Sequence, residues 1–71
     1  MDTQTEEKGM DTRIEELIAI GAAVTANCVP CLRHHLEKAR QAGVEDAQIR
    51  SAVRVGRMVR KGATLPFAFS G

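Results

Sequence analysis

The 71-residue sequence contains no run of about 18 apolar residues, so no segment is expected to span a membrane. It also lacks an excess of either sign of charge. The sequence has ten lysines and arginines and nine aspartates and glutamates, which gives a net charge of +1. A balance this even predicts no attraction to nucleic acid or to an anionic membrane. Residues 1–8 are polar and lack the apolar core of a signal peptide, so we expect a cytoplasmic protein.

Only two cysteines are present, Cys28 and Cys31, and a single disulfide is too little to staple a secreted scaffold. In a reducing compartment a Cys-x-x-Cys pair is redox-active, metal-binding or without a special role. The chain is long enough for one domain at most, and a monomer of this size buries only about 60% of its unfolded surface. Oligomerisation is therefore the expected source of further stability.

Three segments repeat apolar residues at helical spacing, and no strand-like alternation is strong enough to predict a sheet. The expected fold class is therefore all-α. Residues 1–11 are polar and aperiodic and are expected to form a flexible tail, whereas residues 12–71 are expected to form one helical domain. The first helix should begin near Thr12, with Asp11 or Thr12 as its N-cap. Its apolar face is expected to comprise Ile14, Leu17, Ile18, Gly21, Val24 and Thr25.

A second helix is expected at about residues 28–42, with Asn27 as its N-cap. Pro30 suits the first turn, because an amide missing there costs no hydrogen bond within the helix. Gly43 and Val44 have the pattern of a helix stop, in which glycine takes a left-handed conformation and the next residue supplies an apolar contact. The second helix is therefore expected to end just before Gly43.

A third helix is expected at about residues 46–61, with an apolar side and a basic side. The apolar side comprises Ile49, Ala52, Gly56 and Val59, continued by Ala63. The basic side is a stripe of Arg50, Arg54, Arg57 and Lys61, which we interpret as a solvated face because no aromatic residue interleaves it. Phe67 and Phe69 follow in the tail, where they would be core or subunit-interface residues.

The cysteine pair stands where thiol chemistry is favoured. A helix N-terminus carries about half a positive charge, which stabilises the thiolate that acts as nucleophile. Three-residue spacing places Cys28 and Cys31 on neighbouring turns of one face, so a disulfide can form with little backbone movement. His35 lies one turn beyond Cys31 on that face and could accept or return a thiol proton near neutral pH.

Metal binding and an inert structural role remain alternatives to redox chemistry. A c-type haem site requires histidine directly after the second cysteine, and Leu32 stands there. Zinc has four candidate ligands, Cys28, Cys31, His34 and His35. Neighbouring histidines on a helix point about 100° apart, so both cannot readily join the cysteines around one tetrahedral ion. We therefore expect little zinc in the protein, although a zinc shared between subunits stays possible.

Glu16, Cys28, Cys31 and His35 are spaced as Glu-x11-Cys-x2-Cys-x3-His. This spacing resembles the signature of the alkyl hydroperoxidase D-like branch of the carboxymuconolactone decarboxylase family. The resemblance extends roughly over residues 14–63 and implies an all-helical fold, built around a helical hairpin, that assembles as dimers, trimers or hexamers. It implies reduction of a small peroxide or disulfide, with an unidentified thiol as electron donor and no cofactor.

The resemblance assigns Cys28 and Cys31 as the redox pair and His35 and Glu16 as a proton relay. Between the cysteines, where better-studied peroxidases of the family carry a histidine, this sequence has only valine and proline. Helix geometry by itself favours an exposed Glu16. In an unbroken helix it would lie about 18 Å along the axis from Cys28 and point about 130° away from the apolar stripe of its own helix.

Overall fold

The computed structural model describes residues 9–63, which form three helices and no strand. These helices are α2 (Thr12–Thr25), α3 (Val29–Gln41) and α4 (Asp46–Ala63). The all-α fold class is confirmed, and each helix lies within two residues of its expected bounds. The expectations for residues 1–8 and for Phe67 and Phe69 lie outside the described part of the chain.

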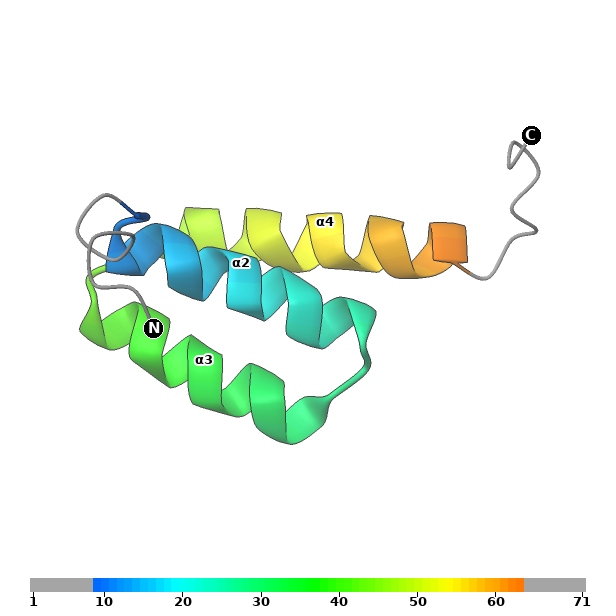
Figure 1. Cartoon of the computed structure of the whole chain (residues 1–71), viewed down its shortest axis with the longest axis horizontal. Helices are drawn as coiled ribbons and strands as arrows, with labels where there is room; N and C mark the ends of the chain where they lie inside the picture. The colour runs from blue at the N-terminus through cyan, green and yellow to red at the C-terminus, as the bar shows by residue number, and fades with distance from the viewer. Residues whose placement is uncertain (1–8, 64–71) are drawn as a thin grey trace.

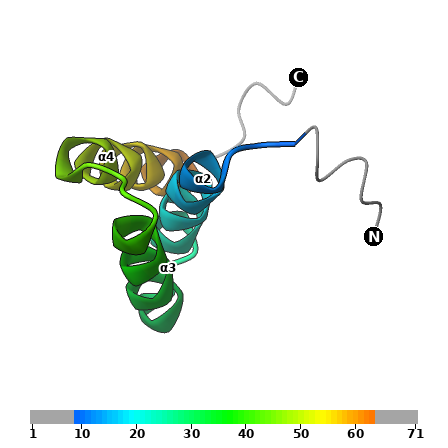
Figure 2. The ribbon, with the colours of Figure 1, turned by 90° about the vertical axis from the view of Figure 1, so that its left-hand side faces the viewer.

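Helix α2 is the element against which both other helices pack. It runs alongside α3 as an antiparallel hairpin, and α4 then returns in the direction of α2 (Figure 1). Seen end-on, α3 and α4 diverge from each other on either side of α2 (Figure 2). A small core joins the three helices, with partly buried leucines and valines packed around it: Ile20, Ala39, Val44 and Ile49.

The turn between α2 and α3 is short because Cys28 takes part in both the end of α2 and the start of α3. Asn27 adopts a left-handed backbone conformation (φ 57°), and the amide of Cys28 donates to Ala23 O at 2.9 Å. This closes α2 with the hydrogen bonds of a Schellman motif. Cys28 is also the N-cap of α3, so the expectation that Asn27 would be this cap was wrong. Asparagine tolerates the left-handed conformation better than most residues and here ends the preceding helix.

The stop after α3 follows the expected pattern. Gly43 has a φ of +87°, and the amide of Val44 donates to Ala39 O at 3.0 Å. Val44 is buried and contributes to the core. The connection from α3 to α4 is therefore fixed by local chemistry at Gly43 and by an apolar contact at Val44. The N-cap of α2 is Asp11, whose carboxylate accepts from Arg13 N, as one of the two expected cap residues.

Helices α2 and α4 lie in close contact at Gly56. A Cβ there would lie 2.6 Å from Gly21 O and 2.9 Å from Val24 Cβ, so any larger residue would push the helices apart. The hydroxyl of Thr25 lies 3.0 Å from both Gly21 O and Gly56 O, and the guanidinium of Arg60 donates to Thr25 O at 3.0 Å. These contacts fix the C-terminal half of α4 beside the C-terminus of α2.

The apolar stripe expected to face inward on α2 is partly open to solvent. Ile14 and Ile18 are 48% and 54% exposed, whereas the residues buried on α2 are Glu16, Ile20 and Ala23. The periodicity identified the helix correctly but not its most buried face, because α2 contacts a helix on each of two sides. Val59 on α4, also expected inside, is 54% exposed. Within residues 9–63 no helix is long and apolar enough to cross a membrane.

Candidate functional site

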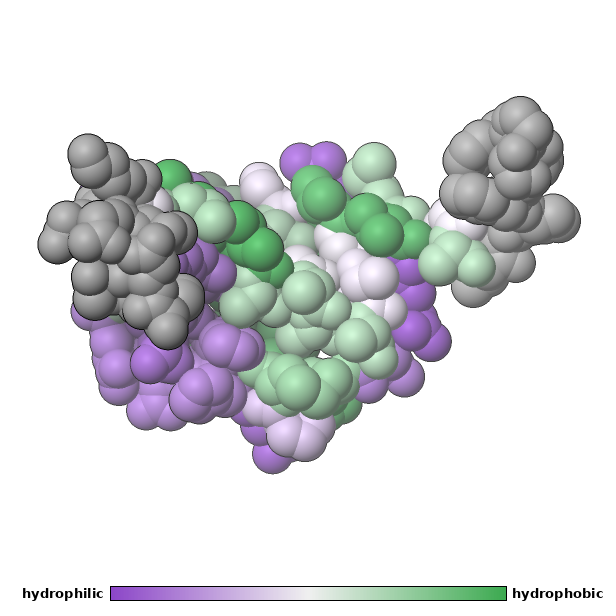
Figure 3. Space-filling model, in the orientation of Figure 1, coloured by the Kyte–Doolittle hydropathy of each residue, from purple (hydrophilic) through white to green (hydrophobic). Residues whose placement is uncertain are grey.

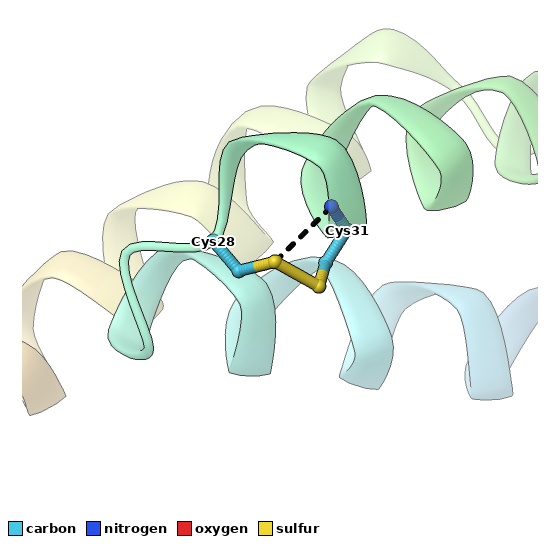
Figure 4. The surroundings of a disulfide bond; sticks show 2 residues. All are labelled: Cys28 and Cys31. Atoms are coloured by element: carbon cyan, nitrogen blue, oxygen red, sulfur yellow. Dashed lines mark hydrogen bonds between the residues drawn. A yellow bond between two sulfur atoms is a disulfide. The ribbon is translucent and has the colours of Figure 1, made fainter.

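Cys28 and Cys31 form a disulfide at the N-terminus of α3 (Figure 4). Their Cα atoms lie 5.3 Å apart, within the usual range for a disulfide and as three-residue helical spacing predicts. Cys28 is half-buried and Cys31 is exposed, so the cysteine pair lies at the surface of the protein. The expected juxtaposition of the two cysteines is therefore present in the folded chain.

The sulfur of Cys28 takes the place that a serine or aspartate oxygen takes in an ordinary N-cap. Its Sγ accepts a hydrogen bond from the Cys31 amide at 3.3 Å (Figure 4). On reduction, a thiolate at this position would receive the same N–H and the positive end of the helix dipole. The local structure therefore favours the charged, reactive form of the thiol and makes Cys28 a good leaving group from the disulfide.

Glu16 and His35 form a buried polar pair between α2 and α3. His35 Nδ1 lies 2.7 Å from Glu16 Oε1, and the glutamate side chain is only 9% exposed. No buried side-chain nitrogen or oxygen in residues 9–63 lacks a hydrogen-bond partner, so the buried carboxylate of Glu16 is satisfied. His35 is 30% exposed and therefore keeps access to solvent.

The expectation that Glu16 would be exposed was wrong. It rested on the axial distance of an unbroken helix and on the apolar stripe of α2 alone. The chain instead reverses at Asn27, so α3 runs back alongside α2 (Figure 1). This reversal brings His35 Nδ1 to 2.7 Å from Glu16 Oε1. The side of α2 that carries Glu16 is covered by α3, and the carboxylate is buried because a histidine is there to bind it.

The carboxylate fixes the chemical form of the imidazole. An ionised Glu16 can only accept hydrogen bonds, so the hydrogen of the His35 ring is assigned to Nδ1, which then donates to Glu16. In the neutral ring the lone pair is then on Nε2, which is the atom able to accept a proton. His35 lies four residues after Cys31 on α3, one helical turn away. A histidine held in this form has the chemistry of a general base.

A metal centre finds no support in the described residues. Within residues 9–63 no group of three or more histidines, cysteines, aspartates or glutamates is placed to hold an ion. The His34 and His35 rings meet edge to face at 4.8 Å, and His34 is exposed while His35 turns to Glu16. The two histidines therefore do not act as one ligand pair.

Sequence reasoning missed one contact that supports the turn at the disulfide. Arg60 donates to Thr25 O, a carbonyl in the last turn of α2 and three residues before Cys28. Arginine near a helix C-terminus is a common stabilising feature when the two are on the same helix. Here the partners are 35 residues apart, so no local pattern in the sequence reveals the contact.

Residues 1–70 match the carboxymuconolactone decarboxylase family, so nearly the whole chain is covered. The chain belongs to the carboxymuconolactone decarboxylase family. Membership confirms the family of the expected resemblance, and the all-helical hairpin with its cysteine pair agrees with it. A family that includes enzymes, together with a paired cysteine site, is compatible with a redox role for this chain.

A relative from Paracoccus denitrificans, named "Uncharacterized protein 4 in cox locus", is 34% identical over 59 residues. The alignment covers 83% of this chain and 53% of the relative, so this carboxymuconolactone decarboxylase family member spans about half the length of the curated relative it matches. No solved structure gives a significant match.

Proposed function

We propose that this family member is a thiol-dependent oxidoreductase of the alkyl hydroperoxidase D-like branch that reduces small peroxides through Cys28 and Cys31. The observation that carries the proposal is the 2.7 Å contact between Glu16 and His35 on the hairpin that also holds the Cys28–Cys31 disulfide. A redox pair and a carboxylate-oriented histidine are the parts that such a reaction requires.

The proposed cycle begins with the reduced pair. One cysteine gives its proton to His35 Nε2, and its thiolate attacks the peroxide oxygen, forming a sulfenic acid and releasing an alcohol that takes up a proton. The second thiolate then attacks the sulfenic sulfur, which releases water and closes the Cys28–Cys31 disulfide. Two electrons from an external dithiol, or from two thiols, return the pair to its reduced state. No metal or cofactor takes part.

The first test is oxidation of the reduced protein by one equivalent of an organic hydroperoxide, followed by alkylation and mass measurement. We expect a disulfide within one chain, because three-residue spacing at the N-terminus of α3 brings the Cα atoms of Cys28 and Cys31 to 5.3 Å. The product should be two hydrogens lighter than the reduced chain and carry no alkyl group. If the protein still carries two alkyl groups after treatment with excess peroxide, the peroxidase proposal is refuted. If the reduced protein is oxidised by a small disulfide but not by peroxide, its activity is restricted to disulfide exchange.

We further propose that the protein works as a homo-oligomer of two, three or six copies. The supporting feature is an open groove of about 710 Å³ between α2 and α4, lined without a single charged side chain. Ile14, Ile18, Val55 and Val59 line it and are each about half exposed. Figure 3 shows apolar side chains gathered over these two helices. A second copy of the same face is the occupant that a self-complementary apolar surface favours.

Replacing Ile18 with glutamate is expected to dissociate the assembly into monomers at micromolar concentration. Ile18 is 54% exposed in the single chain, so the charge disturbs no core contact but would have to be desolvated in an interface. Met58→Glu is the matched control, because Met58 is 60% exposed but lines no part of the α2–α4 groove. Sedimentation of a stable wild-type monomer, or equal dissociation of both variants, would contradict this assignment.

A further inference from the structure

The carboxylates of residues 9–63 are unevenly distributed along the axis of the bundle, whereas cations occur at both ends. The C-termini of α2 and α4 and the N-terminus of α3 point toward the same end of the bundle, and this disulfide end carries the Cys28–Cys31 bond (Figure 1). Residues 24–36 and 52–63, which make up this end, contain five cations and no carboxylate. The cations are Arg33, Arg54, Arg57, Arg60 and Lys61.

The exposed carboxylates lie elsewhere. Asp11 and Glu15 lie at the start of α2, and Glu45 and Asp46 lie at the start of α4. Both helix starts are at the end of the bundle opposite the disulfide. Glu37 lies in the second half of α3. The remaining carboxylate side chain of residues 9–63 is Glu16, which is buried and bonded to His35. The charges of residues 9–63 therefore favour a positive field over the disulfide end.

Two contacts hold the C-terminal half of α4 beside the end of α2, from which the chain turns into the disulfide. The Arg60 guanidinium donates to Thr25 O, three residues before Cys28, and Gly56 O lies 3.0 Å from the Thr25 hydroxyl. The last two turns of α4 are thus fixed beside the turn that leads into the disulfide. Arg54 and Arg57 are exposed on this half of α4, where they also border a surface groove of about 530 Å³.

We propose that the thiol which reduces the Cys28–Cys31 disulfide is anionic, with carboxylates close to its sulfur. This inference rests on the proposed redox function and names the chemistry of its electron donor. A donor thiolate attacks one sulfur of the disulfide and expels the other as a thiolate, which gives a mixed disulfide. A second donor thiolate then breaks the mixed disulfide, leaving an oxidised donor and two protein thiolates that take up protons. Both steps bring negative charge into the positive field, which favours donors with additional carboxylates.

The donor can be a small molecule or a thiol on an acidic protein surface, since both present the same chemistry. The experiment therefore has two arms, both measuring reduction of the protein disulfide without peroxide. One arm compares 3-mercaptopropionate, 2-mercaptoethanol and cysteamine, with rates expressed per thiolate and corrected for thiol basicity. The other compares two short cysteine peptides, one flanked by aspartates and one by lysines. A larger charge preference among the small thiols indicates a small donor, and a larger one among the peptides indicates a protein donor.

At an ionic strength of 10 mM, where screening extends to about 30 Å, we expect the anionic small thiol to react about tenfold faster than the cationic one. The preference should largely vanish in 0.5 M salt. Replacing Arg54 and Arg57 together with glutamine should lower the ratio about threefold. The charge-matched control is Lys38→Gln with Arg40→Gln, because these cations lie in the last turn of α3 at the opposite end and should leave the ratio unchanged.

Equal rates for anionic and cationic thiols in both arms, or a faster cationic thiol, would overturn the inference. So would an equal fall in the ratio for the Arg54/Arg57 variant and its control. Because peroxide is absent, a charge preference can be present in a protein that fails to reduce peroxide. Failure of the proposed peroxidase function and failure of this inference are therefore separate results.

Discussion

Replacing either Cys28 or Cys31 with serine is expected to reduce catalytic peroxide consumption to the rate of the protein-free reaction. The cycle closes only when one thiol resolves the sulfenic acid formed on the other, and neither single variant can form the Cys28–Cys31 disulfide. Serine is close to cysteine in size and is among the strongest N-cap residues, so Cys28→Ser keeps the cap of α3. The loss is therefore chemical rather than structural.

The two serine variants should differ in a single turnover. The variant that retains the attacking cysteine should still consume one equivalent of peroxide and accumulate a sulfenic acid, which a dimedone adduct reveals by mass. The other variant should consume none. Circular dichroism of both reduced variants provides the folding control. Sustained turnover by either variant at the wild-type rate would show that the disulfide is not part of the cycle.

Removing the imidazole of His35 is expected to slow oxidation of the reduced protein by about 10²–10⁴-fold, the usual contribution of general-base assistance. His35→Ala tests this directly but leaves the buried carboxylate of Glu16 without its partner, at a cost of about 1–3 kcal/mol in stability. His35→Gln is the better variant, because its amide can donate to Glu16 but cannot take a thiol proton. His34→Gln, at an exposed neighbouring histidine, is the matched control and should leave the rate unchanged.

Glu16→Gln should produce a smaller loss, about 10- to 100-fold, as is typical when the outer partner of a functional histidine is replaced. Because Glu16 would act through His35, the two substitutions should be non-additive, and the double variant should react no more slowly than His35→Gln alone. The measurement is a pH–rate profile of thiol oxidation for the wild type, both single variants and the double variant. Multiplicative losses would show that Glu16 and His35 act independently.

Local signals in the sequence were sufficient for much of this fold. Helical periodicity identified the three helices, and Gly43 followed by Val44 predicted a stop that the structure confirms. The position of Cys28 and Cys31 at a helix N-terminus also followed from spacing and from the proline between them. Each of these features depends on interactions within a few residues, which the sequence records directly.

Features that depend on how helices pack could not be derived in the same way. The geometry of a single helix predicts that Glu16 is exposed. Only the residue spacing that resembles a known family links Glu16 to His35. Periodicity places Ile18 on the apolar face of α2, but it does not show which neighbour covers that face, and Ile18 is 54% exposed. Asn27 suits either the start of one helix or the end of another, and the choice depends on the chain reversal that brings α3 back beside α2.

The central claim is that Cys28 and Cys31 form a catalytic redox pair that reduces peroxide. The most direct measurement follows peroxide and thiol together, with the protein at catalytic concentration and a dithiol in excess. We predict many peroxide molecules consumed per chain, with one dithiol oxidised for each, and none above background for the Cys28→Ser/Cys31→Ser double variant. Consumption limited to one peroxide per chain, or equal consumption by the double variant, would contradict the claim.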